Sequence, residues 1–158
     1  MEKIYLGIDP GLAGGMAVVS DKSATAVINM PQTPKDILDW LTSLTEFADE
    51  GGFQVVAVLE DVGHGMPGQS SSATAKFARH CGHIEMALLA LGIHTETVTP
   101  QKWQKTYQLG KSKEYTKTQW KNRLKAKAQQ LFPDLGKKVT LSTADALLIA
   151  EYGRRTGL

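Results

Sequence analysis

The stretch that decides the fold is "IYLGIDPGLAGG", at residues 4–15. Apolar residues alternate from Ile4 to Ile8, which is the pattern of a β-strand with a buried face. The strand ends on a carboxylate, Asp9, and a Pro-Gly pair follows it directly. A carboxylate in this position either caps the following turn or, if it is buried, is paired or binds a cation. The choice between these two interpretations depends on which residues the rest of the chain places near Asp9.

The segments that follow have the periodicities of strands and helices in turn. Residues 14–20 and 24–30 complete an antiparallel meander with the first strand, and 53–61 has the continuous apolar run of a central parallel strand. We further expect helices over 35–50, 73–91 and 142–155, a strand over 92–100, a short helix over 101–109 and a basic amphipathic helix within 110–132. This order predicts an α/β fold of the ribonuclease H-like type, with a mixed five-stranded sheet and helices on both faces.

Length and composition favour one domain over residues 1–158. The chain is 42% hydrophobic and has a single cysteine, Cys81, so an internal disulfide framework is excluded. There is no apolar run of membrane-spanning length and no signal peptide before the first strand. We therefore expect a cytoplasmic protein with no membrane partner.

The charge is unevenly distributed along the chain. Nine basic residues and one acid, Glu114, lie between Lys102 and Lys127, so this segment carries a net charge of +8. The remainder has nine basic and fifteen acidic residues and a net charge of −6. A basic segment on an acidic body indicates either a surface for a polyanion such as DNA or a solvated helix face.

Three carboxylates lie where the local sequence predicts burial. Asp9 and Glu60 end two strands that are neighbours in this topology, and Asp145 lies in the first turn of the last helix. Three converging carboxylates suit a hard divalent cation such as Mg²⁺. The structural alternatives are a turn cap for Asp9, an exposed position for Glu60 and a favourable helix-dipole position for Asp145.

A nucleotide site is a weaker interpretation of the same residues. The segment "GIDPG" also resembles the phosphate-binding turn of sugar kinases and actin-like ATPases. Those proteins enclose a nucleotide between two such domains, and 158 residues supply one. We therefore expect no nucleotide cofactor.

Taken in order, the motifs resemble a known family. The segments "GIDPGLAGG", "VLED", "VTPQKWQKTY" and "STADALLIA", with the helix from Ser72 to Leu91, are similar to RuvC-like Holliday junction resolvases over nearly the whole chain. The segments "WQKTYQL" and "ADALLIAEYG" resemble especially the plant chloroplast branch and its phage relatives. Since no transit peptide precedes the first strand, a bacterial or phage origin in a bacterial cell is the simpler expectation.

The resemblance implies a homodimer that nicks two opposing strands of a four-way DNA junction and leaves 5′-phosphate and 3′-hydroxyl ends. Asp9, Glu60 and Asp145 match the metal-binding acids. They would hold two Mg²⁺ ions about 4 Å apart, or Mn²⁺ in their place, with Asp9 between the two. Lys117 matches a basic residue beside the scissile phosphate, and Lys102 or Lys105 a second basic position.

Further DNA contacts are expected from Lys111, Lys113 and Lys121 in the basic segment. The loop from Gly63 to Gly68 lies where the bacterial enzymes insert an aromatic wedge, and here it holds His64 and Met66. The helix from Ser72 to Leu91 matches the dimer helix. Glycines after Asp9 would let a DNA backbone approach that carboxylate.

One departure concerns the metal site. Ser142 stands where the bacterial pattern has a fourth acid, three residues before Asp145. Either Ser142 or water completes the metal shell, or another acid does so. The nearest, Asp61, should point away from Glu60 because strand side chains alternate. Ser142 also reads as the N-cap of the last helix, which is the interpretation we favour.

The sequence therefore predicts a magnesium-dependent endonuclease for four-way or other branched DNA. The alternatives are a ribonuclease of the same fold that acts on RNA or on RNA:DNA hybrids, and a junction-binding protein without catalytic activity.

Overall fold

The sheet has the mixed topology that the sequence predicts. The computed structural model describes residues 1–63 and 68–158. Its five strands lie in the order β3-β2-β1-β4-β5. The first three are antiparallel neighbours, whereas β4 and β5 run parallel to β1. The strands are β1 (Glu2–Asp9), β2 (Gly15–Val19), β3 (Ala24–Asn29), β4 (Phe53–Glu60) and β5 (His94–Val98).

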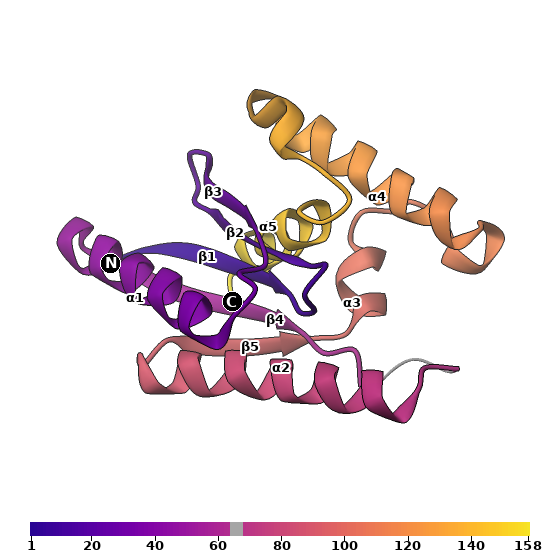
Figure 1. Ribbon diagram of the computed structural model, residues 1–158. Coiled ribbons are helices and arrows are strands. Elements are labelled where there is room, and N and C mark those ends of the chain that lie inside the picture. The colour runs from indigo at the N-terminus through magenta and orange to yellow at the C-terminus, as the bar shows by residue number, and fades with distance from the viewer. Residues whose placement is uncertain (64–67) are drawn as a thin grey trace.

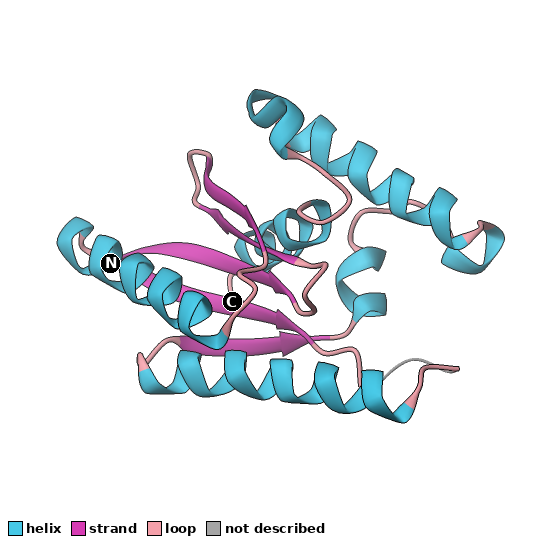
Figure 2. Ribbon diagram, viewed as in Figure 1, coloured by secondary structure: helices cyan, strands magenta, loops and turns pink. Residues whose placement is uncertain are grey.

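Helices cover both faces of this sheet, so the expected ribonuclease H-like layering is confirmed (Figures 1 and 2). One face carries α1 (Pro34–Gly51) and α2 (Ser71–Ala90). The other carries α3 (Pro100–Lys105), α4 (Lys117–Leu131) and α5 (Ala144–Thr156). Short 3-10 turns lie at Ser112–Glu114 and Pro133–Lys138. Within the part of the chain that the structure describes, no helix is long and apolar enough to cross a membrane.

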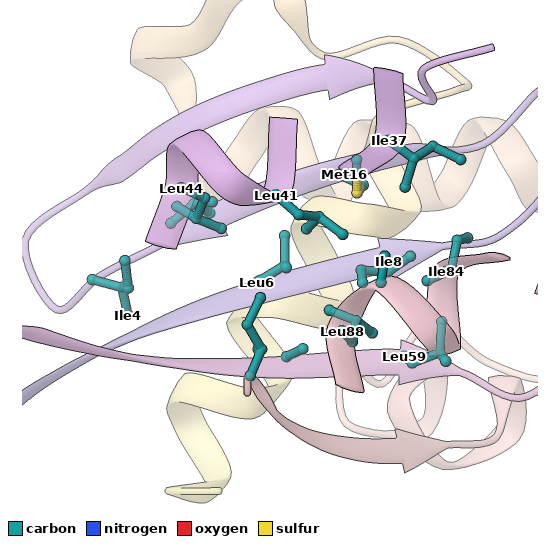
Figure 3. Packing of buried hydrophobic residues seen from close by; sticks show 14 of the residues in the cluster. Ile4, Leu6, Ile8, Met16, Ile37, Leu41, Leu44, Leu59, Ile84 and Leu88 are labelled. Atoms are coloured by element: carbon teal, nitrogen blue, oxygen red, sulfur yellow. The ribbon is translucent and has the colours of Figure 1, made fainter. Parts of the chain in front are cut away.

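The core beneath α1 and α2 explains the alternation in the first strand. Ile4, Leu6 and Ile8 point to this face, where they pack with α1 residues such as Leu41 and α2 residues such as Leu88 (Figure 3). The helix α1 begins and ends as its sequence indicates. Thr33 accepts a hydrogen bond from the Asp36 backbone, and Gly52 ends the helix with a left-handed φ of 71°.

The opposite face depends on a close approach between α5 and β1. A Cβ atom at Gly7 would lie 2.1 Å from the carbonyl oxygen of Ala146, and one at Gly153 would lie 2.7 Å from a methyl group of Val58. No side chain larger than glycine fits at either contact. The sheet therefore holds α5 against its centre, and this places the first turn of α5 over the carboxyl ends of β1 and β4.

Candidate active site

Strand register brings two of the predicted acids together. In the parallel pair β1–β4, Gly7 lies opposite Val58 and Ile8 opposite Leu59. The next step along both strands reaches Asp9 and Glu60, the last residue of each. Side chains alternate along a strand, so both carboxylates point to the face that α5 covers.

The third acid comes from α5. Asp145 is in its first turn, and the segment before this turn packs on β2. A Cβ atom at Gly15 would lie 2.7 Å from the carbonyl oxygen of Ser142, and one at Gly14 would lie 2.1 Å from that of Asp9. Both glycines are buried, and protein backbone occupies the space beside them. The close approach at Gly15 brings the segment before Asp145 toward Asp9, whereas Gly11 and Gly14 line a pocket beside Asp9, where the expected approach of DNA stays a prediction.

The three carboxylates perturb one another. Burial raises the pKa of Asp9 to about 8, and the charges of Asp145 and Glu60 add to this effect. Burial likewise raises the pKa of Glu60 to about 7 and that of Asp145 to about 6. The contact between the two side chains further raises the pKa of Asp9 and lowers that of Glu60 against the larger effect of burial. This cluster is costly to ionise without a cation.

A pocket of about 780 Å³ opens over the acids, and α4 contributes two cations to it. Lys117 and Lys121, one helical turn apart, line this pocket with Asp9, Glu60 and Asp145. The charge of Lys121 lowers the pKa of both Asp9 and Asp145 against the larger effect of burial. Lys117, which the sequence analysis placed beside the scissile phosphate, lines the same pocket. The charge that lowers the pKa of the acids, however, is that of Lys121.

Glu60 has a partner that the sequence analysis missed. The indole Nε1 of Trp103 donates a hydrogen bond of 2.6 Å to Glu60 Oε2. Trp103 is fully buried and belongs to the core beneath α5. A single large apolar side chain in the polar run 101–105 indicates packing, and nothing in its spacing signals a contact 43 residues away.

The donor set fits a hard divalent cation. In residues 1–63 and 68–158, no three acidic, histidine or cysteine side chains form a ready-made metal cluster. Asp9 and Glu60 nevertheless end neighbouring strands, and the charges of Asp145 and Glu60 raise the pKa of Asp9, as expected for crowded carboxyls. The same carboxylates, once deprotonated, are the oxygen ligands that Mg²⁺ prefers.

The structure corrects the interpretation of Ser142. The last helix begins at Ala144, and Thr143 occupies the N-cap position without a side-chain capping bond. Thr143 Oγ1 instead donates to the Lys138 carbonyl (2.8 Å) and accepts from the Thr140 backbone N–H (2.9 Å). These bonds, which Ser142 does not make, fix the turn before the helix. Ser142 is therefore not the N-cap, and the pocket is lined by its neighbour Leu141.

Asp61 also differs from expectation. It lines the same pocket as Glu60, because β4 ends at Glu60 and the alternation of side chains ends with it. Its Oδ1 accepts a hydrogen bond of 2.9 Å from the Gly63 backbone. Asp61 is thus an exposed fourth acid at the pocket.

The remaining predicted DNA-binding residues are spread over a wider surface. Lys102 and Lys105 are exposed on α3, and Lys111 and Lys113 are exposed in the segment leading to α4. His64 and Met66 lie outside the described residues. One cation of the basic segment has a structural role: Arg123 lies over the Tyr115 ring at 4.6 Å and donates to the Leu109 carbonyl.

Comparison with known proteins shows the fold. Over 98% of this chain and 96% of the other, the structure is similar to Thermus thermophilus RuvC in complex with a Holliday junction substrate, with a TM-score of 0.62 at 17% identity. A second Thermus thermophilus RuvC structure gives 0.61 at 15% identity over the same shares of both chains. The yeast mitochondrial Holliday junction resolvase gives 0.44 at 15% identity, over 96% of this chain and 78% of that one.

No family model and no curated protein matches the sequence. The resemblance to RuvC-like resolvases is thus confirmed at the level of the fold and over nearly the full length.

Proposed function

We propose that this protein is a metal-dependent endonuclease that nicks four-way DNA junctions at two symmetric strands. One observation carries the proposal. Asp9, Glu60 and Asp145, from three separate elements, meet in a pocket that Lys117 and Lys121 also line. Burial of these three acids costs stability, which a function in binding cations explains.

The acids would hold two Mg²⁺ ions, with Mn²⁺ as the alternative. When bound, the ions lower the pKa of a water and stabilise the leaving oxygen. The water oxygen bonds to phosphorus, the bond from phosphorus to the 3′-oxygen breaks, and the 3′-oxygen takes a proton. The products are a 5′-phosphate and a 3′-hydroxyl.

Asp61 is our candidate for the fourth acid of the site. Comparison of Asp61→Asn with Ser142→Ala in one cleavage assay shows which of the two residues contributes.

The two lysines of α4 have different expected roles. Lys121 is coupled to Asp9 and Asp145, so we assign it to balance the charge of the acids before substrate binds. Lys117 lies one turn away and would offset charge that develops on the phosphate. Lys102, Lys105, Lys111 and Lys113 would contact DNA backbone further out, with binding that weakens steeply as salt rises.

A homodimer would match the two symmetric nicks of a junction. The helix α2 supports this role, because Met86 and Leu89 are 62% and 73% exposed on it. Gly82 lies on the same helix and has open space around it. Sedimentation of the native protein and of Leu89→Glu tests the dimer, which the charged variant should dissociate.

Two other functions remain as alternatives. A ribonuclease of the same fold would use the same acids on RNA or on RNA:DNA hybrids, and an inactive junction-binding protein would use the lysines without the acids. Digestion of a four-way junction, linear duplex DNA, an RNA:DNA hybrid and duplex RNA, each with Mg²⁺ or Mn²⁺, separates the three. We expect cleavage of the junction; preferential cleavage of the hybrid or the RNA would contradict the proposal, as would junction binding without nicking.

A further inference from the structure

The contact between Trp103 and Glu60 joins a core side chain to an acid of the site. The two atoms are 2.6 Å apart, and both side chains are buried, with Trp103 fully so and Glu60 7% exposed. A hydrogen bond to an ionised acceptor is shorter and stronger than a neutral one. The contact therefore restrains a carboxylate that could otherwise adopt several rotamers.

The chemistry of the indole limits what this contact can do. An indole N–H donates and cannot accept, so Trp103 can pair with Glu60 Oε2 when that oxygen carries no proton. The same carboxylate lies beside Asp9, the last residue of the neighbouring strand β1. Glu60 is thus held between a fixed donor in the core and the acid beside it.

Trp103 is itself fixed from two directions. Thr99 and Pro100 start α3 directly after β5, and the Trp103 backbone N–H donates to the Thr99 carbonyl at 3.3 Å. The Tyr107 ring meets the Trp103 ring edge-on, with centroids 6.3 Å apart. The Tyr107 hydroxyl in turn donates to the Leu148 carbonyl of α5. The helix that carries Asp145 therefore also anchors the donor to Glu60.

We propose that Trp103 is a positioning residue, which through its indole N–H orients the Glu60 carboxylate for divalent-cation binding with Asp9 and Asp145. This inference rests on the proposed function for its purpose, but it makes a claim about cation affinity that stands apart from DNA cleavage. The ordinary reading, that a buried indole has found an acceptor, predicts no effect on that affinity.

The chain offers a matched control. Trp120 Nε1 donates to Gln104 Oε1 at 3.2 Å, so it makes a similar bond to a neutral amide. Trp103→Phe and Trp120→Phe each remove one indole N–H and keep an aromatic ring. Calorimetric titration of the full chain with MgCl₂ measures the affinity of each, and thermal melting shows whether each folds.

We expect Trp103→Phe to weaken Mg²⁺ affinity by about tenfold, the scale of partners that orient metal ligands. Trp120→Phe should stay within about twofold of the native protein, as for a substitution away from the site. Equal affinities for the native protein and Trp103→Phe would overturn the inference. Should Trp103→Phe not fold, NMR of the native indole N–H groups decides, because the Trp103 resonance should shift with MgCl₂ and with Glu60→Gln. A resonance that responds to neither would overturn the inference.

These results are distinguishable from failure of the proposed function. A native protein that binds Mg²⁺ but cuts no junction, with tenfold weaker binding in Trp103→Phe, contradicts the function and supports the inference. A native protein that cuts junctions, with unchanged Mg²⁺ affinity in Trp103→Phe, supports the function and contradicts the inference. A native protein that binds no Mg²⁺ contradicts both.

Discussion

Buried acids lie at the start of α5 and near its end, and their surroundings shift their pKa values in opposite directions. At its start, Asp145 lies with Asp9 and Glu60, and burial with mutual repulsion raises the pKa of Asp9. Near its end, Glu151 is 6% exposed and accepts hydrogen bonds of 2.8 to 2.9 Å from Arg154 and Arg155. Burial pushes the pKa of Glu151 upward, but the two arginines outweigh it and hold that pKa below its ordinary value.

The difference separates an acid that is neutralised within the protein from one that we propose to be functional, on a single helix. Glu151 has its counter-charges within the protein, so its ionised form is the stable one. Around the start of α5, Lys121 is a partial counter-charge for Asp9 and Asp145, and Glu60 lies in the same cluster. A divalent cation would supply the balance. Substitutions at the start of α5 should therefore affect catalysis, whereas substitutions near its end should affect stability.

The largest expected effect is on catalysis at the start of α5. Asp145→Asn removes one negative charge from the acid cluster while it keeps the shape of the side chain. We expect the rate of junction cleavage to fall by about a thousandfold, since cation chemistry supplies several kcal/mol of transition-state stabilisation. Single-turnover cleavage measures the rate. A melting temperature below that of the native metal-free protein would contradict the view that this acid costs stability.

Substitution at the other end should affect stability instead. Glu151→Ala removes the acid that Arg154 and Arg155 share, although Arg154 keeps its 3.4 Å contact with Asp21 and both arginines can turn toward solvent because they are about a third exposed. We expect a loss of about 2 kcal/mol in the free energy of unfolding, below the range for a fully buried pair. Urea denaturation measures it. Cleavage per folded molecule should stay at the native level, and its loss would show that this end also serves the reaction.

The two ends should also respond to pH with opposite sign. The pKa of Asp9 in the folded chain, about 8, lies above its ordinary value of 3.8, so the folded chain binds the extra proton between these limits. Its stabilising contribution is complete in acid and is lost as pH rises toward 8. The lowered pKa of Glu151 acts in reverse, with stability lost as pH falls below the unfolded value.

Thermal melting in EDTA from pH 5 to pH 8.5 checks this difference. The native protein should lose stability as pH rises, and Asp9→Asn should lose less. Added Mg²⁺ should restore the native protein at the upper end of the range. An equal pH slope in the native protein and in Asp9→Asn would contradict the assignment of the effect to Asp9.

A smaller effect is expected for the lysine nearest the acids. Lys121→Ala removes an exposed positive charge beside the pocket, and a charge about 4 Å from another contributes about 1 kcal/mol in water. We expect cleavage to fall about fivefold at saturating DNA. Lys125→Ala is the control, as it removes the same charge one turn further along α4. An equal effect of the two would assign Lys121 to general DNA attraction.

Much of the fold could be read from the sequence because its signals are local. The alternation from Ile4 to Ile8 and the continuous apolar run in 53–61 act through near neighbours. The acids Asp9 and Glu60 followed from strand ends, since neighbouring parallel strands place their carboxyl ends at one edge. The predicted topology alone was enough to expect these two acids to be buried together with Asp145.

The parts that were missed depend on packing between distant segments. The bond from Trp103 to Glu60 depends on how α3 leaves β5, and the coupling of Lys121 depends on the rotation of α4 about its axis. The wrong N-cap at Ser142 has a different cause. Ser142 and Thr143 are both good capping residues, and bonds of Thr143 to Thr140 and Lys138 decide between them.

The central claim is that the acids at the start of α5 form a nuclease site for branched DNA. Cleavage of a four-way junction by the native protein, by Asp9→Asn and by Glu151→Gln, with linear duplex DNA of the same sequence beside it, tests it most directly. The account predicts Mg²⁺-dependent nicks at symmetric positions for the native protein and Glu151→Gln, with the linear DNA intact. It also predicts at least about a thousandfold loss for Asp9→Asn. Cleavage by Asp9→Asn at the native rate, or equal cutting of linear DNA, would contradict it.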